Sequence, residues 1–344
     1  MKYNLLGDTG LLVSELCFGT MTFGGEGMWE AIGQQEQEEA DELIQKSVDS
    51  GINFIDTANI YSFGQSETIL GNSIKNLELN RDELVIATKL RGKMGDQPNN
   101  QGLSRYHIFN SVEKSLARLQ IDHIDLLYVH GVDPVTSVRE IMRGLNDIVE
   151  SGKVRYIGVC NWPAWMVMKA LGISRQEGWH EFKAMQYFYS LSSRDVEDSL
   201  IPLSQSEQLG FMPWSPLAGG FLSGKYTRDN EKAGDGSRRD EFDFPPIDKE
   251  QAYDIVDVMK EIADKHDASV AEIALAWVRL QTGVTSTIIG AKNMDQLSSN
   301  IRSVELDLSD HELKELDEVS STTKRYPYWM VDRQGANRIP NANE

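Results

Sequence analysis

The sequence predicts a single α/β domain, a (β/α)8 barrel of the TIM type, with an N-terminal β-hairpin and long loops at its carboxyl-terminal rim. Three observations predict this fold, and a doubly wound sheet is the alternative. Eight short apolar runs alternate with amphipathic helical stretches, most of these runs are apolar throughout, and no linker or composition shift divides the 344 residues. Uninterrupted apolar strands are expected where helices cover both faces of a parallel sheet.

The elements follow one another in a regular order. Residues 3–15 form two apolar runs around Gly7-Asp-Thr-Gly10, a pattern that predicts a β-hairpin. The barrel strands are predicted at 16–20, 53–57, 84–88, 124–129, 155–160, 184–188, 210–214 and 285–289. Helices are predicted at 35–50, 66–77, 104–119, 137–151, 163–176, 196–209, 269–282 and 293–301, because amphipathic stretches there end near glycines.

Two stretches interrupt this alternation. Residues 225–248 form a polar insertion rich in glycine and proline after the seventh barrel strand, and residues 321–344 form an aromatic tail that is predicted to be irregular. Long loops in a compact fold are often lids or binding loops. The prediction is therefore one domain over residues 1–344, with 225–248 as a covering loop.

Charge and cysteine content restrict the partners and the compartment. The formal net charge is −19, which argues against nucleic acid or an anionic membrane as a partner. Cys17 and Cys160 both lie in apolar runs, so a disulfide framework is not expected and a reducing cytoplasm is favoured. The N-terminus lacks the apolar core of a signal peptide, and no apolar stretch is long enough to span a bilayer.

Ionisable and polar residues stand where the predicted strands end. Asp56, Lys89 and His130 each close an apolar run, and Tyr61 follows Asp56 by five residues in a predicted loop. Cys160, Asn161, Gln186, Trp214 and Ser215 occupy similar positions. Any one of these residues alone is more often structural than functional. Because the carboxyl ends of the strands in a parallel barrel meet at one rim, the set together indicates an active site.

The four ionisable groups are suited to carbonyl reduction. A lysine beside a tyrosine is expected to lower the pKa of the phenol from its usual value near 10, and an aspartate keeps the lysine charged and oriented. Tyr61 is then the proton donor to a developing alkoxide, while His130 orients the carbonyl. The hydride must come from a cofactor.

Signatures along the chain resemble those of the aldo-keto reductase superfamily, in both order and spacing. They read NFIDTANIYSFGQSETILG, LVIATK, DLLYVHG, VRYIGVCNW, MQYFYS, PWSPLAGGFLSGKY and IIGAKNMDQLSSN. The resemblance implies a (β/α)8 barrel that binds NADP(H) without a Rossmann domain and interconverts aldehydes or ketones with alcohols. It implies catalytic roles for Asp56, Tyr61, Lys89 and His130. The chain also resembles the potassium-channel β-subunits, in which an amide replaces the histidine. The alternative is therefore a non-catalytic NADPH-binding redox sensor or regulatory subunit on the same scaffold.

The resemblance also implies the cofactor contacts. Asn161 and Gln186 match the groups that hold the nicotinamide carboxamide, with Cys160 in place of the usual serine, and Trp214 matches the ring that stacks on the nicotinamide. Residues matched to the pyrophosphate loop are Ser215, Pro216, Leu217, Gly219 and Lys225, with Arg238 as a clamp in the insertion. Residues matched to the adenosine-phosphate site are Gly290, Lys292, Gln296 and Asn300; Gly19, Thr20, Met21 and Asp56 complete the predicted set.

Lys292 offers a positive charge for a 2′-phosphate, which favours NADP(H) while leaving NAD(H) open. The predicted substrate pocket combines Tyr61 and His130 with the aromatic residues Phe23, Trp29 and Trp162. The tail aromatics Tyr326, Tyr328 and Trp329 are further candidates for its wall. The sequence leaves the particular carbonyl substrate, the direction of the reaction and the oligomeric state open.

Two other functions are disfavoured. Residues 219–225 satisfy G-x-x-x-x-G-K, but Tyr226 stands where a nucleotide-binding P-loop has the serine or threonine that holds Mg²⁺. Asp122 and Asp125 are possible metal ligands, but their position before a strand places them at the opposite end of the barrel. No metal site is expected.

Overall fold

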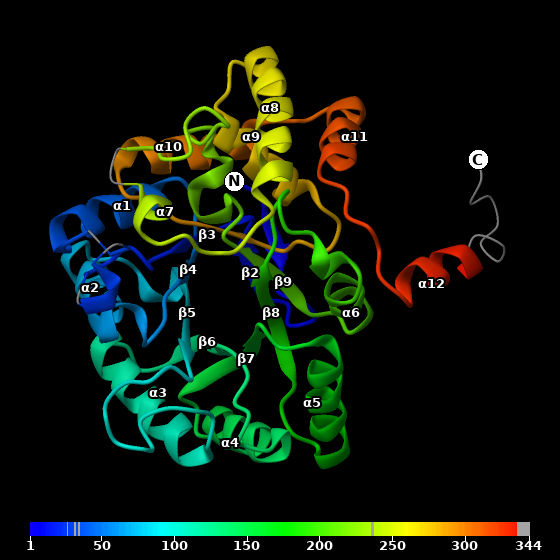
Figure 1. Cartoon of the computed structure of the whole chain (residues 1–344). Coiled ribbons are helices and arrows are strands. Elements are labelled where there is room, and N and C mark those ends of the chain that lie inside the picture. The colour runs from blue at the N-terminus through cyan, green and yellow to red at the C-terminus, as the bar shows by residue number, and fades with distance from the viewer. Residues whose placement is uncertain (26, 31, 34, 235–236, 336–344) are drawn as a thin grey trace.

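A ring of eight parallel strands forms the centre of the protein (Figure 1). The structure is a computed structural model that describes residues 1–25, 27–30, 32–33, 35–234 and 237–335. The strands are β3 (Leu16–Gly19), β4 (Phe54–Asp56), β5 (Val85–Leu90), β6 (Ile124–Val129), β7 (Val154–Cys160), β8 (Phe182–Phe188), β9 (Gly210–Trp214) and β10 (Thr287–Ile289). They lie in the order β10-β3-β4-β5-β6-β7-β8-β9. A parallel bridge between Phe211 in β9 and Val284, three residues before β10, brings the two ends of the sheet together. The ring is thus nearly closed, and the predicted barrel is confirmed.

Helices surround the strands, as the crossover connections of a parallel sheet require. The predicted helices are observed as α1 (Gln37–Asp49), α2 (Gln65–Asn76), α3 (Arg105–Leu119), α4 (Val138–Glu150), α5 (Ala164–Glu177), α6 (Leu200–Ser206), α9 (Val270–Leu280) and α10 (Met294–Arg302). The prediction missed α8 (Lys249–His266) and α11 (Asp310–Val319). Among the described residues, no helix is long and apolar enough to cross a membrane.

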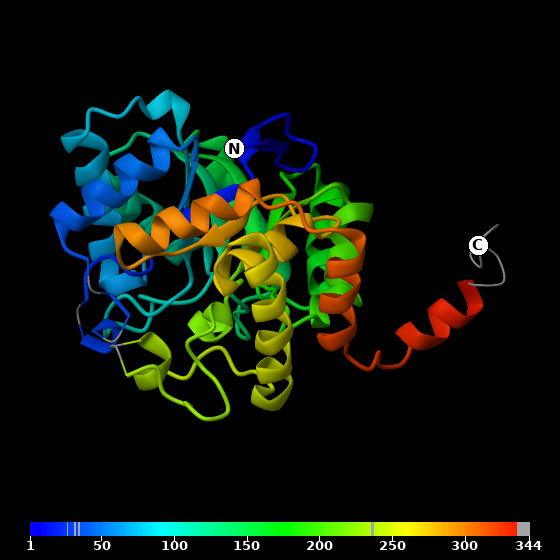
Figure 2. The ribbon, with the colours of Figure 1, turned by 90° about the horizontal axis from the view of Figure 1, so that it is seen from above.

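The predicted hairpin forms from β1 (Tyr3–Leu5) and β2 (Leu12–Ser14) and closes one end of the barrel. Leu6, in its turn, is fully buried and packs in the barrel interior with Phe54, Tyr128 and Met212. Figure 2 shows the hairpin in dark blue and the 225–248 insertion in yellow-green at opposite ends of the barrel. The insertion therefore lies at the end where an active site is expected.

The C-terminal tail differs from the prediction. Residues Tyr328–Gly335 form a helix, α12, instead of an irregular segment, and residues 336–344 lie outside the described part of the chain. Pro327 immediately precedes this helix, and a fixed proline φ favours the first helical turn. The helix projects away from the barrel in both views (Figures 1 and 2), and Tyr326 and Trp329 are exposed. The structure thus does not support tail aromatics as walls of the pocket.

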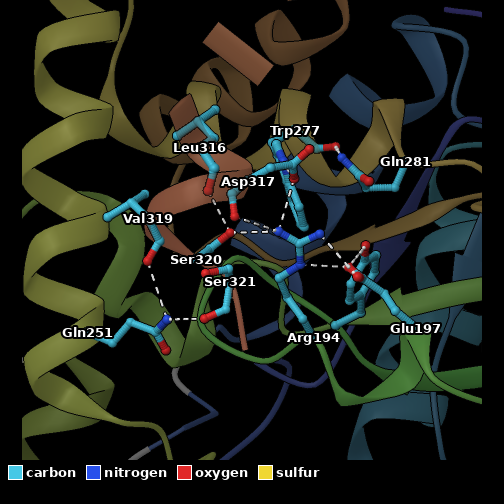
Figure 3. Close-up of polar contacts among 11 residues, drawn as sticks. Arg194, Glu197, Gln251, Trp277, Gln281, Leu316, Asp317, Val319, Ser320 and Ser321 are labelled. Atoms are coloured by element: carbon cyan, nitrogen blue, oxygen red, sulfur yellow. Dashed lines mark hydrogen bonds and ion pairs between the residues drawn. The ribbon is translucent and has the colours of Figure 1, made fainter. Parts of the chain in front are cut away.

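Arg194 fastens helix α11 to the barrel (Figure 3). Its guanidinium group lies 5.0 Å from the centre of the Trp277 ring, pairs with Glu197 and Asp317, and donates to Ser320 Oγ at 2.9 Å. Arg194 follows β8, whereas Asp317 and Ser320 lie at the end of α11. The contact therefore holds the last helix of the barrel in place before the tail begins.

Candidate active site

Three of the four predicted catalytic side chains meet inside the barrel, at the carboxyl ends of β4 and β5. Lys89 Nζ forms an ion pair with Asp56 Oδ1 and donates hydrogen bonds to Tyr61 Oη at 3.2 Å and to the backbone oxygen of Thr57 at 2.9 Å. The Lys89 and Asp56 side chains are buried, and Tyr61 is 9% exposed. The phenol therefore faces the rim while the ion pair lies behind it.

Backbone contacts with β5 position this group. The N–H of Thr57 donates to Ala87 O at 2.9 Å, and the N–H of Asn59 donates to Lys89 O at 3.0 Å. The chain after β4 therefore continues beside β5 before turning into the 3₁₀ segment η2 (Tyr61–Gly64). This path carries Tyr61 to the side chain of Lys89, which explains the five-residue spacing between Asp56 and Tyr61.

Gln186 joins the same network from the opposite wall of the barrel. Its amide nitrogen donates to Asp56 Oδ2 at 2.9 Å, so both oxygen atoms of the carboxylate have partners. The sequence predicted a cofactor contact for Gln186 and gave no sign of this one. The two residues are 130 positions apart, and their contact depends on barrel closure across β8 and β4.

The protonation states differ in part from the prediction. Burial lowers the pKa of Lys89, but Asp56 and Tyr61 outweigh that effect and raise it, so the amine is charged. Burial has the largest effect on the pKa of Tyr61 and raises it, Lys89 lowers it, and Asp56 raises it, so that the pKa of the phenol lies above its usual value. The predicted net fall in the pKa of the phenol is therefore wrong, although Lys89 acts in the predicted sense. Tyr61 is protonated at neutral pH.

His130 directly follows β6 and lies beside the phenol. The two ring centres are 5.8 Å apart in an edge-to-face arrangement. Burial, followed by the charges of Lys89 and Arg91, lowers the pKa of His130 to about 3. Its imidazole is therefore neutral at neutral pH and retains one N–H that can donate to a carbonyl oxygen.

The predicted phosphate-binding residues lie in turns after β9 and β10, and further predicted cofactor contacts lie at the end of β3, the neighbour of β10 in the barrel. After β9, the backbone has positive φ angles at Ser215, Ala218 and Gly219, and Ser215 Oγ accepts from Gly219 N at 2.9 Å. Small residues in such a turn let backbone N–H groups approach an anion. Lys225 lies exposed just beyond this turn.

The turn after β10 is held by two of the residues predicted to contact the cofactor. Lys292 N donates to Gln296 Oε1 at 2.9 Å, and Asn300 Nδ2 donates to Gly290 O at 3.0 Å. Both side chains therefore shape the turn that carries Lys292. After β3, the hydroxyl of Thr20 is fully buried against other protein groups, so the backbone of this segment and Met21 remain for contacts at the rim.

Two of the residues predicted to contact the nicotinamide, Asn161 and Trp214, are joined to each other by a hydrogen bond. Trp214 Nε1 donates to Asn161 Oδ1 at 3.1 Å, and Asn161 Nδ2 donates to His130 O at 3.3 Å. The Trp214 ring stacks on Phe188, with centres 5.0 Å apart, and lies nearly parallel to Phe244 of the insertion, with centres 6.0 Å apart. A nicotinamide that stacks on Trp214 must therefore compete with these two rings. Cys160 is fully buried in the barrel interior, so its side chain does not reach the rim.

The insertion carries two adjacent arginines with different environments. Arg238 lies at the start of α7 (Arg238–Glu241), and its buried Nε has no hydrogen-bond partner among the described residues. Arg239, which the prediction missed, donates to Ala218 O at 2.7 Å and Pro245 O at 2.9 Å and pairs with Asp243. Arg239 therefore fastens the insertion to the turn after β9. The four-residue spacing between Arg239 and Asp243 is a sequence pattern that indicates an ion pair.

Burial contradicts two of the predicted pocket residues. Phe23 is fully buried and packs 6.0 Å from Phe18, and Trp162 is 1% exposed and packs edge-to-face on Phe182. Both aromatics belong to the core. Trp29, in contrast, lies against Tyr61 with ring centres 5.5 Å apart. The sequence showed that aromatics stand near the rim but not which way they point.

The buried lysine–tyrosine pair lies at the carboxyl-terminal rim of a parallel barrel, where enzymes with this fold carry their active sites. The aldo/keto reductase family model matches residues 15–321, and the chain belongs to that family. It is therefore an oxidoreductase.

Three relatives illustrate the range of the family. A versiconal hemiacetal acetate reductase of Aspergillus parasiticus is 35% identical, covering 92% of this chain and 96% of the relative. An uncharacterized oxidoreductase of Bacillus subtilis is 36% identical, with 93% and 96% covered. A protein of Oryza sativa subsp. japonica named "Probable voltage-gated potassium channel subunit beta" is 34% identical, with 89% and 92% covered.

Proposed function

We propose that the chain is an NADP(H)-dependent reductase that converts aldehydes or ketones to alcohols, reversibly, with Tyr61 as the proton donor. The observation that carries the proposal is the hydrogen bond from the buried Lys89 ammonium to Tyr61 Oη at 3.2 Å. The ammonium stabilises the phenolate that forms when Tyr61 gives up its proton, and Asp56 keeps the ammonium in place.

The residues divide the remaining tasks. His130, neutral and beside Tyr61, donates a hydrogen bond to the carbonyl oxygen and so orients it. Trp29 excludes water from the phenol. When bound, NADP(H) supplies or accepts the hydride.

Positively charged side chains and a turn of small residues at the rim support the choice of this cofactor. The buried Nε of Arg238, which lacks a partner among the described residues, is suited to a phosphate oxygen at the mouth of the barrel. The small-residue turn at 215–219 provides backbone N–H groups for the pyrophosphate, and Lys292 provides a charge for the 2′-phosphate.

Replacing Tyr61 with phenylalanine tests the proposal. Tyr61→Phe is expected to lower kcat for NADPH-dependent reduction of a panel of aldehydes and ketones by about 10²–10⁴-fold, the usual contribution of a positioned acid. Binding of NADPH, followed by its fluorescence, should be retained. Tyr106→Phe, at an exposed position on α3, is the matched control. Near wild-type reduction by Tyr61→Phe contradicts the role of Tyr61, and absence of NADPH consumption by the wild type across the panel contradicts the reductase activity.

A further inference from the structure

A small polar cavity of about 200 Å³ lies between helix α3 and the segment that carries Tyr61. Asn59 lines it on the side of the segment, and His107, Ser111, Lys114 and Arg118 line it on the side of α3. These four α3 residues are spaced by four, three and four positions, so they share one face of the helix. This face of α3 is therefore polar although it faces another part of the protein.

Asn59 is the most constrained group in the cavity wall. Its side chain is 1% exposed, and neither amide atom has a hydrogen-bond partner among the described residues. A buried amide without partners is costly, so such groups in folded proteins normally bind water or a ligand. Its backbone N–H donates to Lys89 O at 3.0 Å, which fixes the position of the residue.

Positive charge remains uncompensated at the cavity. The guanidinium group of Arg118 is paired with the buried carboxylate of Glu67 at 2.7 Å. Lys114 is exposed on the same helix face, and no ion pair to it is found within the described part of the chain. His107 bonds to Ser111 Oγ at 3.1 Å, and burial lowers the pKa of its ring, so it adds no charge at neutral pH.

We propose that this cavity binds a small oxyanion, a phosphate or a short carboxylate, between Lys114 and Asn59. The ammonium and the amide N–H of these residues are suited to charge-assisted hydrogen bonds with anionic oxygens. Typical pockets for larger organic ligands measure about 300–1,000 Å³, so a nucleotide is too large for this cavity. The site is separate from the rim turns that carry the proposed cofactor contacts, and it does not depend on the cofactor.

An anion here acts on the segment that positions Tyr61. Asn59 precedes Tyr61 by two residues, and the N–H of Tyr61 donates to Ala58 O at 3.2 Å. A ligand that bonds to the Asn59 amide therefore restricts opening of residues 57–64. Slower amide hydrogen exchange over 57–64 is the local signature of occupancy.

The test titrates inorganic phosphate, and separately acetate, against chloride at constant ionic strength, and follows both hydrogen exchange at 57–64 and binding by calorimetry. Protection of 57–64 by phosphate, by acetate or by both supports the site and identifies the anion. Lys114→Gln is expected to weaken binding by up to about fivefold, the effect of losing one exposed ion pair. Lys169→Gln, an exposed lysine on α5, is the matched control and should bind as the wild type does.

A second variant guards against an indirect effect. Asn59→Asp keeps the size of the side chain but adds a negative charge, and it should abolish protection of 57–64 by either anion. Two results overturn the proposal. One is protection of 57–64 by neither anion in the wild type, which indicates water alone in the cavity. The other is anion binding that survives Lys114→Gln but is lost in Lys292→Gln, which places the anion in the turn after β10.

Discussion

Lys89 keeps its charge inside the barrel because Asp56, Thr57 and Tyr61 all offer oxygen atoms to its ammonium group. An ion isolated from water is costly, and the cost is offset only when its partners are close and complete. Gln186 completes the arrangement by donating to the second oxygen of Asp56. The surroundings of Tyr61 thus depend on a chain of contacts that reaches across the barrel.

Removing the charge of Asp56 should therefore destabilise the whole fold. Asp56→Asn leaves the buried ammonium of Lys89 without a counter-charge, and the free energy of unfolding in urea should fall by about 3–5 kcal/mol. Asp8→Asn is the control, because it breaks an exposed pair with Lys183, for which less than about 1 kcal/mol is expected. Equal stabilities of the two variants would show that the buried pair is not held as described.

With Tyr61 as the proposed proton donor, the raised pKa of its phenol predicts different pH profiles for reduction and for alcohol oxidation. Reduction requires the phenol, which is already the main form at neutral pH, so its rate should be flat between about pH 6 and pH 9. Alcohol oxidation requires the phenolate, whose fraction rises about tenfold per pH unit below the pKa. Steady-state rates measured in both directions test this, and a flat oxidation profile contradicts it.

The 225–248 insertion carries two arginines with different tasks: Arg239 holds it to the barrel, and Arg238 is proposed to contact the cofactor. Arg239 is buried and donates hydrogen bonds to two backbone oxygens, those of Ala218 and Pro245. Burial lowers the pKa of the neighbouring Arg238, whose environment is therefore poor in water. The same element thus combines an anchor with a cation placed at the barrel mouth.

The two arginines should give opposite phenotypes when each is replaced. Arg239→Ala leaves buried acceptors unpaired, at about 1–3 kcal/mol each, so limited proteolysis within 225–248 should accelerate. Arg238→Ala should leave proteolysis unchanged but raise the Kd for NADPH. Each variant serves as the control for the other. If Arg238→Ala binds NADPH as tightly as the wild type, the insertion does not contact the cofactor through this residue.

Element prediction succeeded where apolar periodicity was strong and the flanking residues marked the ends. The strands and the helices α1 to α5 have that pattern, and they agree with the structure to within a few residues. Helix α8 also has buried residues at helical spacing, including Ala252, Ile255, Val256 and Met259, and Asp248 caps it. The alternation of strands and helices predicts one helix per strand, whereas α8 and α9 both lie between β9 and β10.

For the molecule as a whole, His130 couples its protonation to folding. Its folded pKa of about 3 lies below its unfolded value of 6.5, so protonation favours the unfolded chain. The contribution of the neutral imidazole to the free energy of unfolding is fully present above pH 6.5. It is lost as the pH falls from 6.5 towards 3, at no more than about 1.4 kcal/mol per pH unit.

Urea unfolding across this range should therefore show a weaker loss of stability on acidification for His130→Gln than for the wild type. His311→Gln, at an exposed position on α11, should behave as the wild type does. Parallel profiles for His130→Gln and the wild type would contradict the low pKa of the imidazole.

The sequence alone was enough to predict the barrel, its strands in order, and the position of Asp56, Tyr61, Lys89 and His130 at one rim. These features depend on local signals: apolar runs of strand length, helical periodicity and the positions at which each run ends. A parallel barrel converts those positions along the chain into neighbours in space.

The surroundings of these groups could not be predicted from the sequence and are known from the tertiary structure. The pKa of Tyr61 is raised in spite of Lys89, Phe23 is buried in the core, and Arg239 anchors the insertion. The tertiary structure also placed Asn59 beside Lys114 in a polar cavity. The physical reason is common to all four. Burial and side-chain direction depend on contacts between residues far apart in the sequence, which local periodicity does not encode.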